Sequence, residues 1–186
     1  PSELLLQATA SQALCFGQTG SVNLIASGGV GNYQYDSTPT VNLVSGSYTY
    51  SVTDGNQCTA SATVFIDQAP SAVQLQATVT QPLCFNELGS VVLAASGGVG
   101  NYSYNATPVT NLSAGTFAYT VNDENGCSAS TTATINAAPS QLILTATVSQ
   151  PACYGQLGNV TLTASGGTGN YTFGPDATTN LTVGNY

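Results

Sequence analysis

Five cysteines are the residues of this chain that are best suited to chemistry. Cys15 and Cys58 are 43 positions apart, Cys84 and Cys127 have the same spacing, and Cys153 is the fifth. A catalytic cysteine needs a neighbouring base and a zinc site needs a cluster of Cys or His, but the chain has no His. The residues therefore favour structural disulfides: Cys15–Cys58, Cys84–Cys127, and Cys153 with a partner beyond the end of the sequence.

Two aspartates recur at one position of the sequence. Asp54 lies near Asn56 in the segment DGNQ, and Asp123 lies near Asn125 in DENG. Because calcium prefers several oxygen ligands, Asp54 and Asp123 are candidate calcium ligands, and a hairpin turn is the alternative. The other acidic residues do not recur, and a glycosidase would need a fixed carboxylate pair. We therefore predict no catalytic residue, no enzyme activity and no required cofactor.

Aromatic residues recur in the order aromatic-x-aromatic. The members are Tyr33, Tyr35, Tyr102, Tyr104, Tyr171 and Phe173. Both rings of a pair would share one strand face, which predicts core packing, and an exposed strip that stacks on sugars is the alternative.

Several side chains are candidate glycosylation sites. Ser37, in the segment Asp-Ser-Thr, is a candidate for O-glycosylation. Six asparagines begin Asn-x-Ser/Thr: Asn101, Asn105, Asn111, Asn159, Asn170 and Asn180.

The composition restricts the partners of the chain. It has no Lys or Arg and eight Asp and Glu, which gives a formal net charge of −8. A chain without cationic side chains cannot neutralise phosphates, so we predict no nucleic-acid binding and no attraction to an anionic membrane surface. No run of 18 apolar residues is present, so we also predict no membrane span in this segment.

A 69-residue repeat organises the whole sequence. Pro1, Pro70 and Pro139 are each 69 positions apart, and the first cysteine of each copy keeps the same step. This period predicts small β domains at 1–69, 70–138 and 139–186, the third lacking its last strands. Their junctions carry an Ala-Pro step and no Gly/Ser linker, which predicts a stiff string of domains.

Alternating apolar and polar residues predict strands throughout each repeat. In LLLQATA, Leu4, Leu6 and Ala8 share one face, and SVNLIAS, SYTYSVTD and CTASATVFI alternate in the same way. Turns rich in Gly, Asn and Asp separate these runs. The sequence therefore predicts an all-β fold of tandem immunoglobulin-like antiparallel β-sandwich repeats, each with six to seven strands and one disulfide.

The disulfide prediction depends on the number of strands between the two cysteines. We count four traverses from Cys15 to Cys58, and an even number would return the chain to the same end of a sandwich. Closing this loop would stabilise a repeat by about 4 kcal/mol in the chain-entropy model. Because disulfides persist in oxidising compartments, we expect an extracellular or cell-surface location.

Six short motifs follow one another in the second copy. They are Cys-aromatic, Gly-Ser, Ser-Gly-Gly, Tyr-x-Tyr, Asn-Leu-x-x-Gly and a closing Val-x-Asp-x-x-Gly-Cys that ends at Cys127. In this order the motifs resemble the SprB repeat of giant surface adhesins of gliding Bacteroidota, and the resemblance covers all three copies. The departures are Asn86 and Gln57, which replace glycines, and a third copy without the closing motif. The resemblance implies export by the type IX route and non-enzymatic stalk or contact modules used in adhesion or gliding.

Three functions are consistent with the sequence. The first is an extracellular adhesin or filament protein whose disulfide-stapled domains form a stiff stalk or fibre. Its partners would be other copies or repeats of itself, or a surface polysaccharide or substratum. The second is a polymerising fibre subunit that exchanges donor strands. The third is an array of carbohydrate-binding modules that contact glycans through the paired tyrosines.

Overall fold

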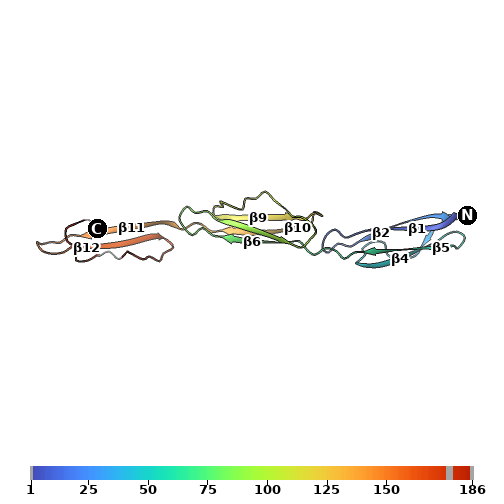
Figure 1. Ribbon diagram of the computed structural model, residues 1–186, viewed down its shortest axis with the longest axis horizontal. Coiled ribbons are helices and arrows are strands. Elements are labelled where there is room, and N and C mark those ends of the chain that lie inside the picture. The colour runs from blue at the N-terminus through green and yellow to red at the C-terminus, as the bar shows by residue number, and fades with distance from the viewer. Residues whose placement is uncertain (1, 175–177, 185–186) are drawn as a thin grey trace. The chain divides into compact units, whose positions relative to one another are not determined.

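The chain forms strands joined by turns and extended segments. The computed structural model describes residues 2–174 and 178–184, so Pro1 and Tyr186, the outer limits of the predicted domains, lie outside them. The first repeat holds β1 (Ser2–Ser11), β2 (Ser21–Gly29), β3 (Gln34–Tyr35), β4 (Gly46–Thr53) and β5 (Thr59–Ile66). The second holds β6 (Gln74–Thr80), β7 (Ser90–Ser96), β8 (Ser103–Tyr104), β9 (Gly115–Asn122) and β10 (Ser128–Ile135), and the third holds β11 (Ser140–Ser149) and β12 (Asn159–Gly167). No helix occurs among the described residues, which confirms the all-β prediction (Figure 1).

Two antiparallel sheets build the first repeat. β1 pairs with β2 in one sheet, and β3, β4 and β5 form the other in that order. Figure 1 shows β4 and β5 lying against β1 and β2. The second repeat repeats this arrangement, with β6 paired to β7 and with β8, β9 and β10 in one sheet. The predicted antiparallel sheets are therefore confirmed.

The number of strands in a repeat differs from the prediction. The structure gives five strands in the first repeat, within the described residues, instead of six to seven. The segment at 36–45, which could have supplied a further strand, contains one isolated bridge, between Leu43 and Gly20. The segment crosses the repeat without forming a ladder.

The facing sides of the two sheets form the core of the first repeat. Its buried members are Val22, Leu43, Tyr50 and Ile66. Leu6 and Ala8 of β1 pack against this cluster, so the predicted inward face of LLLQATA is confirmed. Burying a large apolar side chain stabilises a fold by about 1.5–3 kcal/mol. The Tyr50 hydroxyl keeps a partner in this core because it donates to the Pro39 carbonyl at 2.8 Å.

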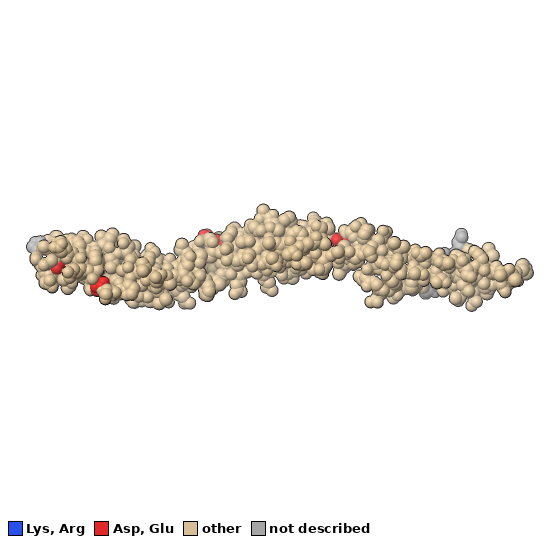
Figure 2. Space-filling model, turned by 180° about the vertical axis from the view of Figure 1, so that it is seen from behind, with Lys and Arg blue, Asp and Glu red and all other residues tan. Residues whose placement is uncertain are grey.

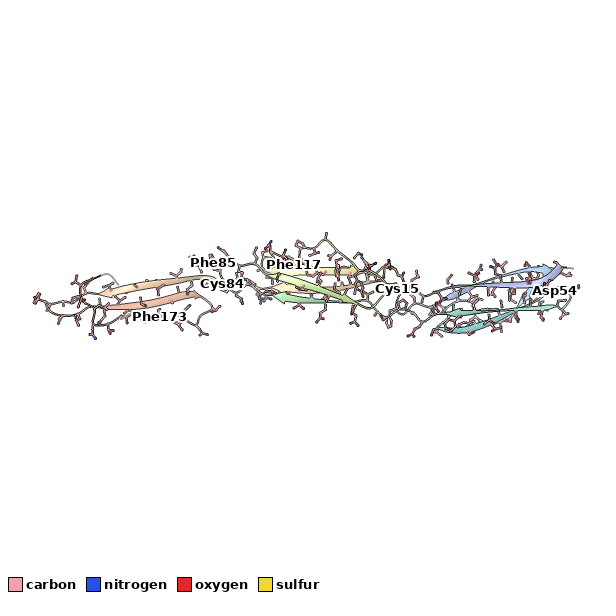
Figure 3. The ribbon with its side chains drawn as sticks, in the orientation of Figure 1. Cys15, Asp54, Cys84, Phe85, Phe117 and Phe173 are labelled. Carbon is pink, nitrogen blue, oxygen red and sulfur yellow. A yellow bond between two sulfur atoms is a disulfide. The ribbon has the colours of Figure 1, made fainter. Side chains whose placement is uncertain are left out.

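The chain direction places the two cysteines of the first repeat at opposite ends. β2 leads from the Cys15 turn to the end where Asp54 lies, the segment from β3 to Leu43 returns, and β4 leads to the Asp54 end again. Figure 3 shows Cys15 and Asp54 at the two ends of this repeat. The chain therefore makes three traverses before Cys58, and an odd number separates the cysteines.

Proximity of Cα atoms divides the chain into two compact units. The first comprises Pro1–Gln76, Leu93–Ala106 and Tyr119–Thr131, and the second comprises Ala77–Val92, Thr107–Ala118 and Thr132–Tyr186. The first unit thus joins the first repeat to one end of the second repeat.

The inner face of β11 in the third repeat is open. Leu142 is 60% exposed and Leu144 is 61% exposed, whereas the equivalent Leu4 and Leu6 are half-buried. In the first repeat, Leu6 packs against the core that β4 and β5 supply. In the third repeat an apolar groove of about 460 Å³ lies there, lined by Leu142, Leu144, Leu162, Tyr171 and Phe173 among others.

Candidate functional site

A tight turn follows β1 and carries Cys15. The Gln18 side chain accepts the backbone N–H groups of Leu14 (3.2 Å) and Cys15 (3.1 Å), and the Gln18 N–H donates to the Cys15 carbonyl at 3.1 Å. These bonds close the turn on itself, so the Leu14 carbonyl and the Cys15 sulfur face outward. We call residues 14–18, and the equivalent residues 83–87 of the second repeat, the cysteine turn.

The hairpin between β9 and β10 carries Cys127 and is organised by Asp123. The Asp123 carboxylate is 5% exposed and accepts the backbone N–H groups of Val99 (2.9 Å), Asn125 (3.0 Å) and Cys127 (2.8 Å). Burial raises the pKa of Asp123 and is the largest single influence, but the N–H groups together hold the pKa below its ordinary value. We call residues 123–127, and the equivalent residues 54–58 of the first repeat, the aspartate hairpin.

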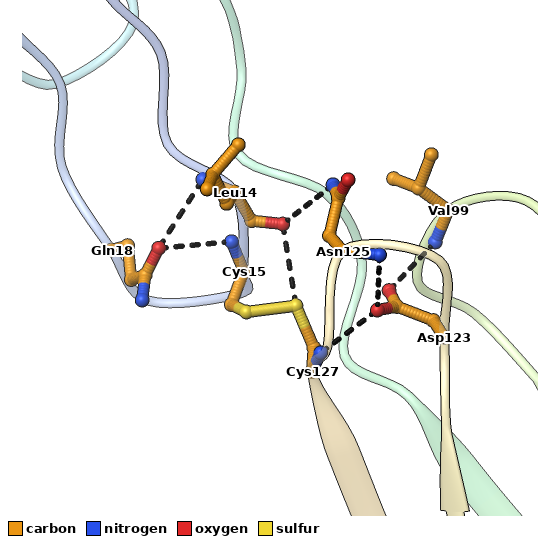
Figure 4. Close-up of a disulfide and its surroundings, with 7 residues drawn as sticks. All are labelled: Leu14, Cys15, Gln18, Val99, Asp123, Asn125 and Cys127. Carbon is orange, nitrogen blue, oxygen red and sulfur yellow. Dashed lines mark hydrogen bonds between the residues drawn. A yellow bond between two sulfur atoms is a disulfide. The ribbon is translucent and has the colours of Figure 1, made fainter.

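A disulfide joins the cysteine turn of the first repeat to the aspartate hairpin of the second. Cys15 is bonded to Cys127, with their Cα atoms 5.7 Å apart, inside the first compact unit. The Asn125 side-chain amide adds a hydrogen bond to the Leu14 carbonyl at 3.0 Å, as Figure 4 shows. Two successive repeats are therefore linked covalently and by a polar contact beside the bond.

The predicted disulfide pairs are wrong in this structure. Cys15 does not pair with Cys58, and Cys84 does not pair with Cys127; Cys58, Cys84 and Cys153 are free and exposed. The reason is the three traverses described above, which put the two cysteines of one repeat at opposite ends. The prediction of disulfide chemistry holds, but the bond staples neighbouring repeats instead of one repeat.

The same hairpin occurs in the first repeat around Asp54. Its carboxylate accepts the N–H groups of Val30, Asn56 and Cys58, each at 2.9 Å, and the side chain is 4% exposed. The hydrogen bond from Val30 is the largest cause of a lowered Asp54 pKa, followed by the bond from Cys58.

Neither Asp54 nor Asp123 has the surroundings of a calcium site. Calcium takes about six to eight oxygen ligands, whereas the groups nearest these carboxylates are N–H donors, which repel a cation. Among the described residues, no group of three or more His, Cys, Asp and Glu side chains could hold a metal ion. The contacts fit the hairpin-turn alternative.

The first tyrosine of each aromatic pair fastens a glycine-rich segment, residues 27–32 in the first repeat and 96–101 and 165–170 in the others, which we call the glycine loop. Its hydroxyl donates to a glycine carbonyl at 2.6 Å in all three repeats: Tyr33 to Gly28, Tyr102 to Gly97 and Tyr171 to Gly166. The second member is more exposed, with Tyr35 and Tyr104 at 44% and Phe173 at 49%. The structure thus gives the first ring an internal role, whereas the second ring lies at the surface and not in the core, where the sequence predicts both rings.

The candidate glycosylation sites lie on the surface. The exposed residues are Ser37, Asn101, Asn105, Asn111, Asn159, Asn170 and Asn180. Two of them, Asn111 and Asn180, have left-handed backbone with φ of 55° and 57°, as does Asn42 at 56°. Sequence reasoning missed this role, although the recurrence of Asn in Asn-Leu was a signal because Asn tolerates positive φ.

The molecular surface offers little charge for recognition. On the face in Figure 2, carboxylates form a few separate spots on an otherwise uncharged surface. No helix among the described residues is long and apolar enough to cross a membrane.

Comparison with known proteins assigns the chain to a family. A search of curated proteins found no match. The family model of the SprB repeat matches residues 7–39, 76–111 and 145–174, which together make up more than half of the chain. Each match begins within the strand before a cysteine turn and includes that turn and the glycine loop. The chain therefore belongs to the SprB repeat family and is a set of its repeat modules.

Proposed function

We propose that this chain is a non-enzymatic part of an extracellular adhesin or filament protein. Its modules form a stalk or fibre that presents repeated contact surfaces, and many weak contacts combine into firm attachment. The family is associated with cell-surface proteins, which supports an extracellular location. The partners would be other repeats of the same kind, a surface polysaccharide or the substratum.

The Cys15–Cys127 disulfide is the observation that carries this proposal. A bond between neighbouring repeats adds nothing to a catalytic or ligand site, but it keeps two modules together when the polypeptide is pulled. The surface is rich in Ser and Thr and its eight carboxylates are sparse, at 4% of the residues, so little charge repulsion opposes the approach of one module to another.

Adhesion under load tests the proposal. Beads that carry the oxidised chain are allowed to settle on glass and on polysaccharide-coated glass, and the shear that detaches them is measured. We expect the oxidised chain to retain beads at a shear that removes bare beads. Cys15→Ser should weaken retention, while Cys58→Ser, which removes a free cysteine, should leave it unchanged. Detachment at the same shear as bare beads would contradict an adhesive role.

Fibre assembly by strand donation is a second candidate function. The surface that a donated segment would cover is the inner face of β11, where Leu142 and Leu144 are more than half exposed. A β-hairpin equivalent to β4 and β5, supplied by another chain, would cover this face as β4 and β5 cover it in the first repeat.

A synthetic peptide with the sequence of residues 46–66 tests strand donation. Binding of the peptide should protect the backbone amides of β11 from hydrogen exchange. A peptide in which Tyr50 and Val52 are replaced by serine is the matched control, because these side chains face the core. Equal exchange with and without the first peptide would rule out this route.

A further inference from the structure

The aspartate hairpin of the first repeat matches the bonded hairpin of the second repeat. Asp54 makes the three hydrogen bonds that Asp123 makes, and equivalent distances differ by no more than 0.1 Å. Cys58 and Asn56 occupy the positions of Cys127 and Asn125. The first hairpin is therefore already folded into the form that accepts a cysteine turn in the second repeat.

Both groups that make the junction in the second repeat are exposed in the first. Cys58 is a free, exposed thiol, and the Asn56 side chain lies on the surface. In the second repeat the corresponding groups bond to Cys15 and to the Leu14 carbonyl. The first hairpin thus has the two groups that bind a cysteine turn in the second repeat, a sulfur and an amide donor. No cysteine turn lies beside it among the described residues.

We propose that this hairpin, built by Asp54, Asn56 and Cys58, is a docking site for the cysteine turn of a preceding SprB-type repeat in the same polypeptide, to which Cys58 forms a disulfide. The occupant is a repeat in the same polypeptide because the chain enters the second repeat next to the observed junction. Gln12, close to the cysteine turn, bonds to Phe65 and Asp67 at the start of that connection. The connection from a preceding repeat would likewise begin beside the cysteine turn of that repeat and lead into β1.

The exposed cysteine turn of the second repeat is the other half of such a junction. The Glu87 carboxylate accepts the N–H groups of Leu83 (2.7 Å) and Cys84 (2.8 Å), as Gln18 does in the first turn. Cys15 and Cys127 are 112 positions apart. Because the repeats share one period, 112 positions also separate the cysteine of any cysteine turn from the cysteine of the aspartate hairpin in the following repeat. A series of repeats is then held by one disulfide at every junction, and none within a repeat.

Formation of the bond is a two-electron oxidation. The thiols of Cys58 and the incoming cysteine lose two protons and two electrons as the sulfur–sulfur bond forms. A low-molecular-weight disulfide in the oxidising compartment accepts them and is reduced to two thiols. The inference concerns the junction alone and does not depend on what the array adheres to.

A chain extended by one repeat tests the inference. A copy of residues 1–69 that carries Cys58→Ser is placed directly before Pro1, so that the 69-residue period continues. After oxidation, the protein is digested without reduction by a protease that cuts before aspartate, and linked peptides are identified by mass spectrometry. We expect the original Cys58 peptide, 54–66, to be linked to peptide 1–35 of the added copy. The original Cys15 peptide differs in mass, because it is extended by residues 67–69 of the copy.

The matched control is the extended chain in which the added copy also carries Cys15→Ser. There Cys58 should stay open to alkylation, while the Cys15–Cys127 link in the same digest reports that the original repeats are folded. The inference is overturned if Cys58 stays reactive although the added cysteine is present. It is also overturned if Cys58 links separate chains into dimers on a non-reducing gel, because the occupant would then be a second copy.

Discussion

Asp36 is a single exposed side chain that ties two segments of the first repeat together. Its carboxylate accepts the Thr38 N–H at 2.9 Å, and the Ser51 N–H and hydroxyl at 2.6 and 2.9 Å. The bonds from Thr38 are the largest cause of a pKa lowered to about 2, followed by the bond from the Ser51 N–H. The folded state thus favours the ionised form of Asp36 more strongly than the unfolded state does.

Acid should therefore weaken the fold through Asp36. A folded pKa below the unfolded value of about 3.9 means that the stabilisation is present above pH 4 and is lost as the pH falls toward 2. We expect the urea midpoint to drop between pH 5 and pH 2. The urea midpoint of the Asp36→Asn variant should drop less over the same pH range, since the asparagine amide does not titrate. Identical pH profiles for both proteins would mean that Asp36 does not couple to folding.

The two tyrosines of a pair should respond differently to substitution. The Tyr33 hydroxyl bonds to the Gly28 carbonyl, so Tyr33→Phe should lower the free energy of unfolding by about 1 kcal/mol. Tyr35→Ala removes a ring that is 44% exposed, so it should lower the free energy of unfolding by less than the removal of a buried ring would. Both values come from chemical denaturation followed by tyrosine fluorescence.

The same pair tests the carbohydrate-binding alternative. If the repeats bind glycans, Tyr35→Ala should abolish retention on a polysaccharide column while the unfolding midpoint changes little. Retention that is lost only in variants that also unfold would assign the rings to folding.

At the scale of elements, the glycines at the end of β2 must approach β1 closely. Gly28 has φ of +74°, and a Cβ there would overlap the carbonyl oxygen of Glu3. Gly17 has φ of +76° but nothing within 4 Å of such a Cβ. Gly17→Ala should therefore cost about 1 kcal/mol from backbone strain, and Gly28→Ala about 3 kcal/mol or more because a backbone clash is added. Equal losses for the two variants would show that backbone strain alone makes this loop need glycine.

The strands and their faces could be predicted from the sequence, while the connection between them could not. Tyr50 and Ile66 lie on the faces that alternation assigned to the core, because period-two patterning is a local property. The segment at 36–45 has no such pattern, so the sequence does not show that it crosses the repeat only once, and a count of traverses from the sequence puts Cys58 at the wrong end. The role of Asp54 was also hidden, since its partner Val30 is 24 positions away and only the folded chain brings them together.

At the scale of the whole molecule, the junction disulfide should change how the chain extends under force. Residues between Cys15 and Cys127 are shielded from tension while the bond is intact, and the two cysteines are 112 positions apart. Full extension of the oxidised chain should therefore be shorter than that of the reduced chain by about 400 Å. Cys15→Ser should remove the difference and Cys58→Ser should keep it, in single-molecule pulling. An oxidised chain as long as the reduced chain would show that no bond spans this segment.

Disulfide mapping of the oxidised chain tests the central claim, the staple between repeats, most directly. Trypsin has no site because Lys and Arg are absent, but a protease that cuts before aspartate separates Cys15 (peptide 1–35) from Cys58 (54–66) and Cys127 (123–175). The Cys153→Ser variant is used so that peptide 123–175 holds a single cysteine, Cys127. We predict that peptide 1–35 is linked to peptide 123–175 and that Cys58 is alkylated. A link between peptides 1–35 and 54–66 would contradict the staple and restore one disulfide per repeat.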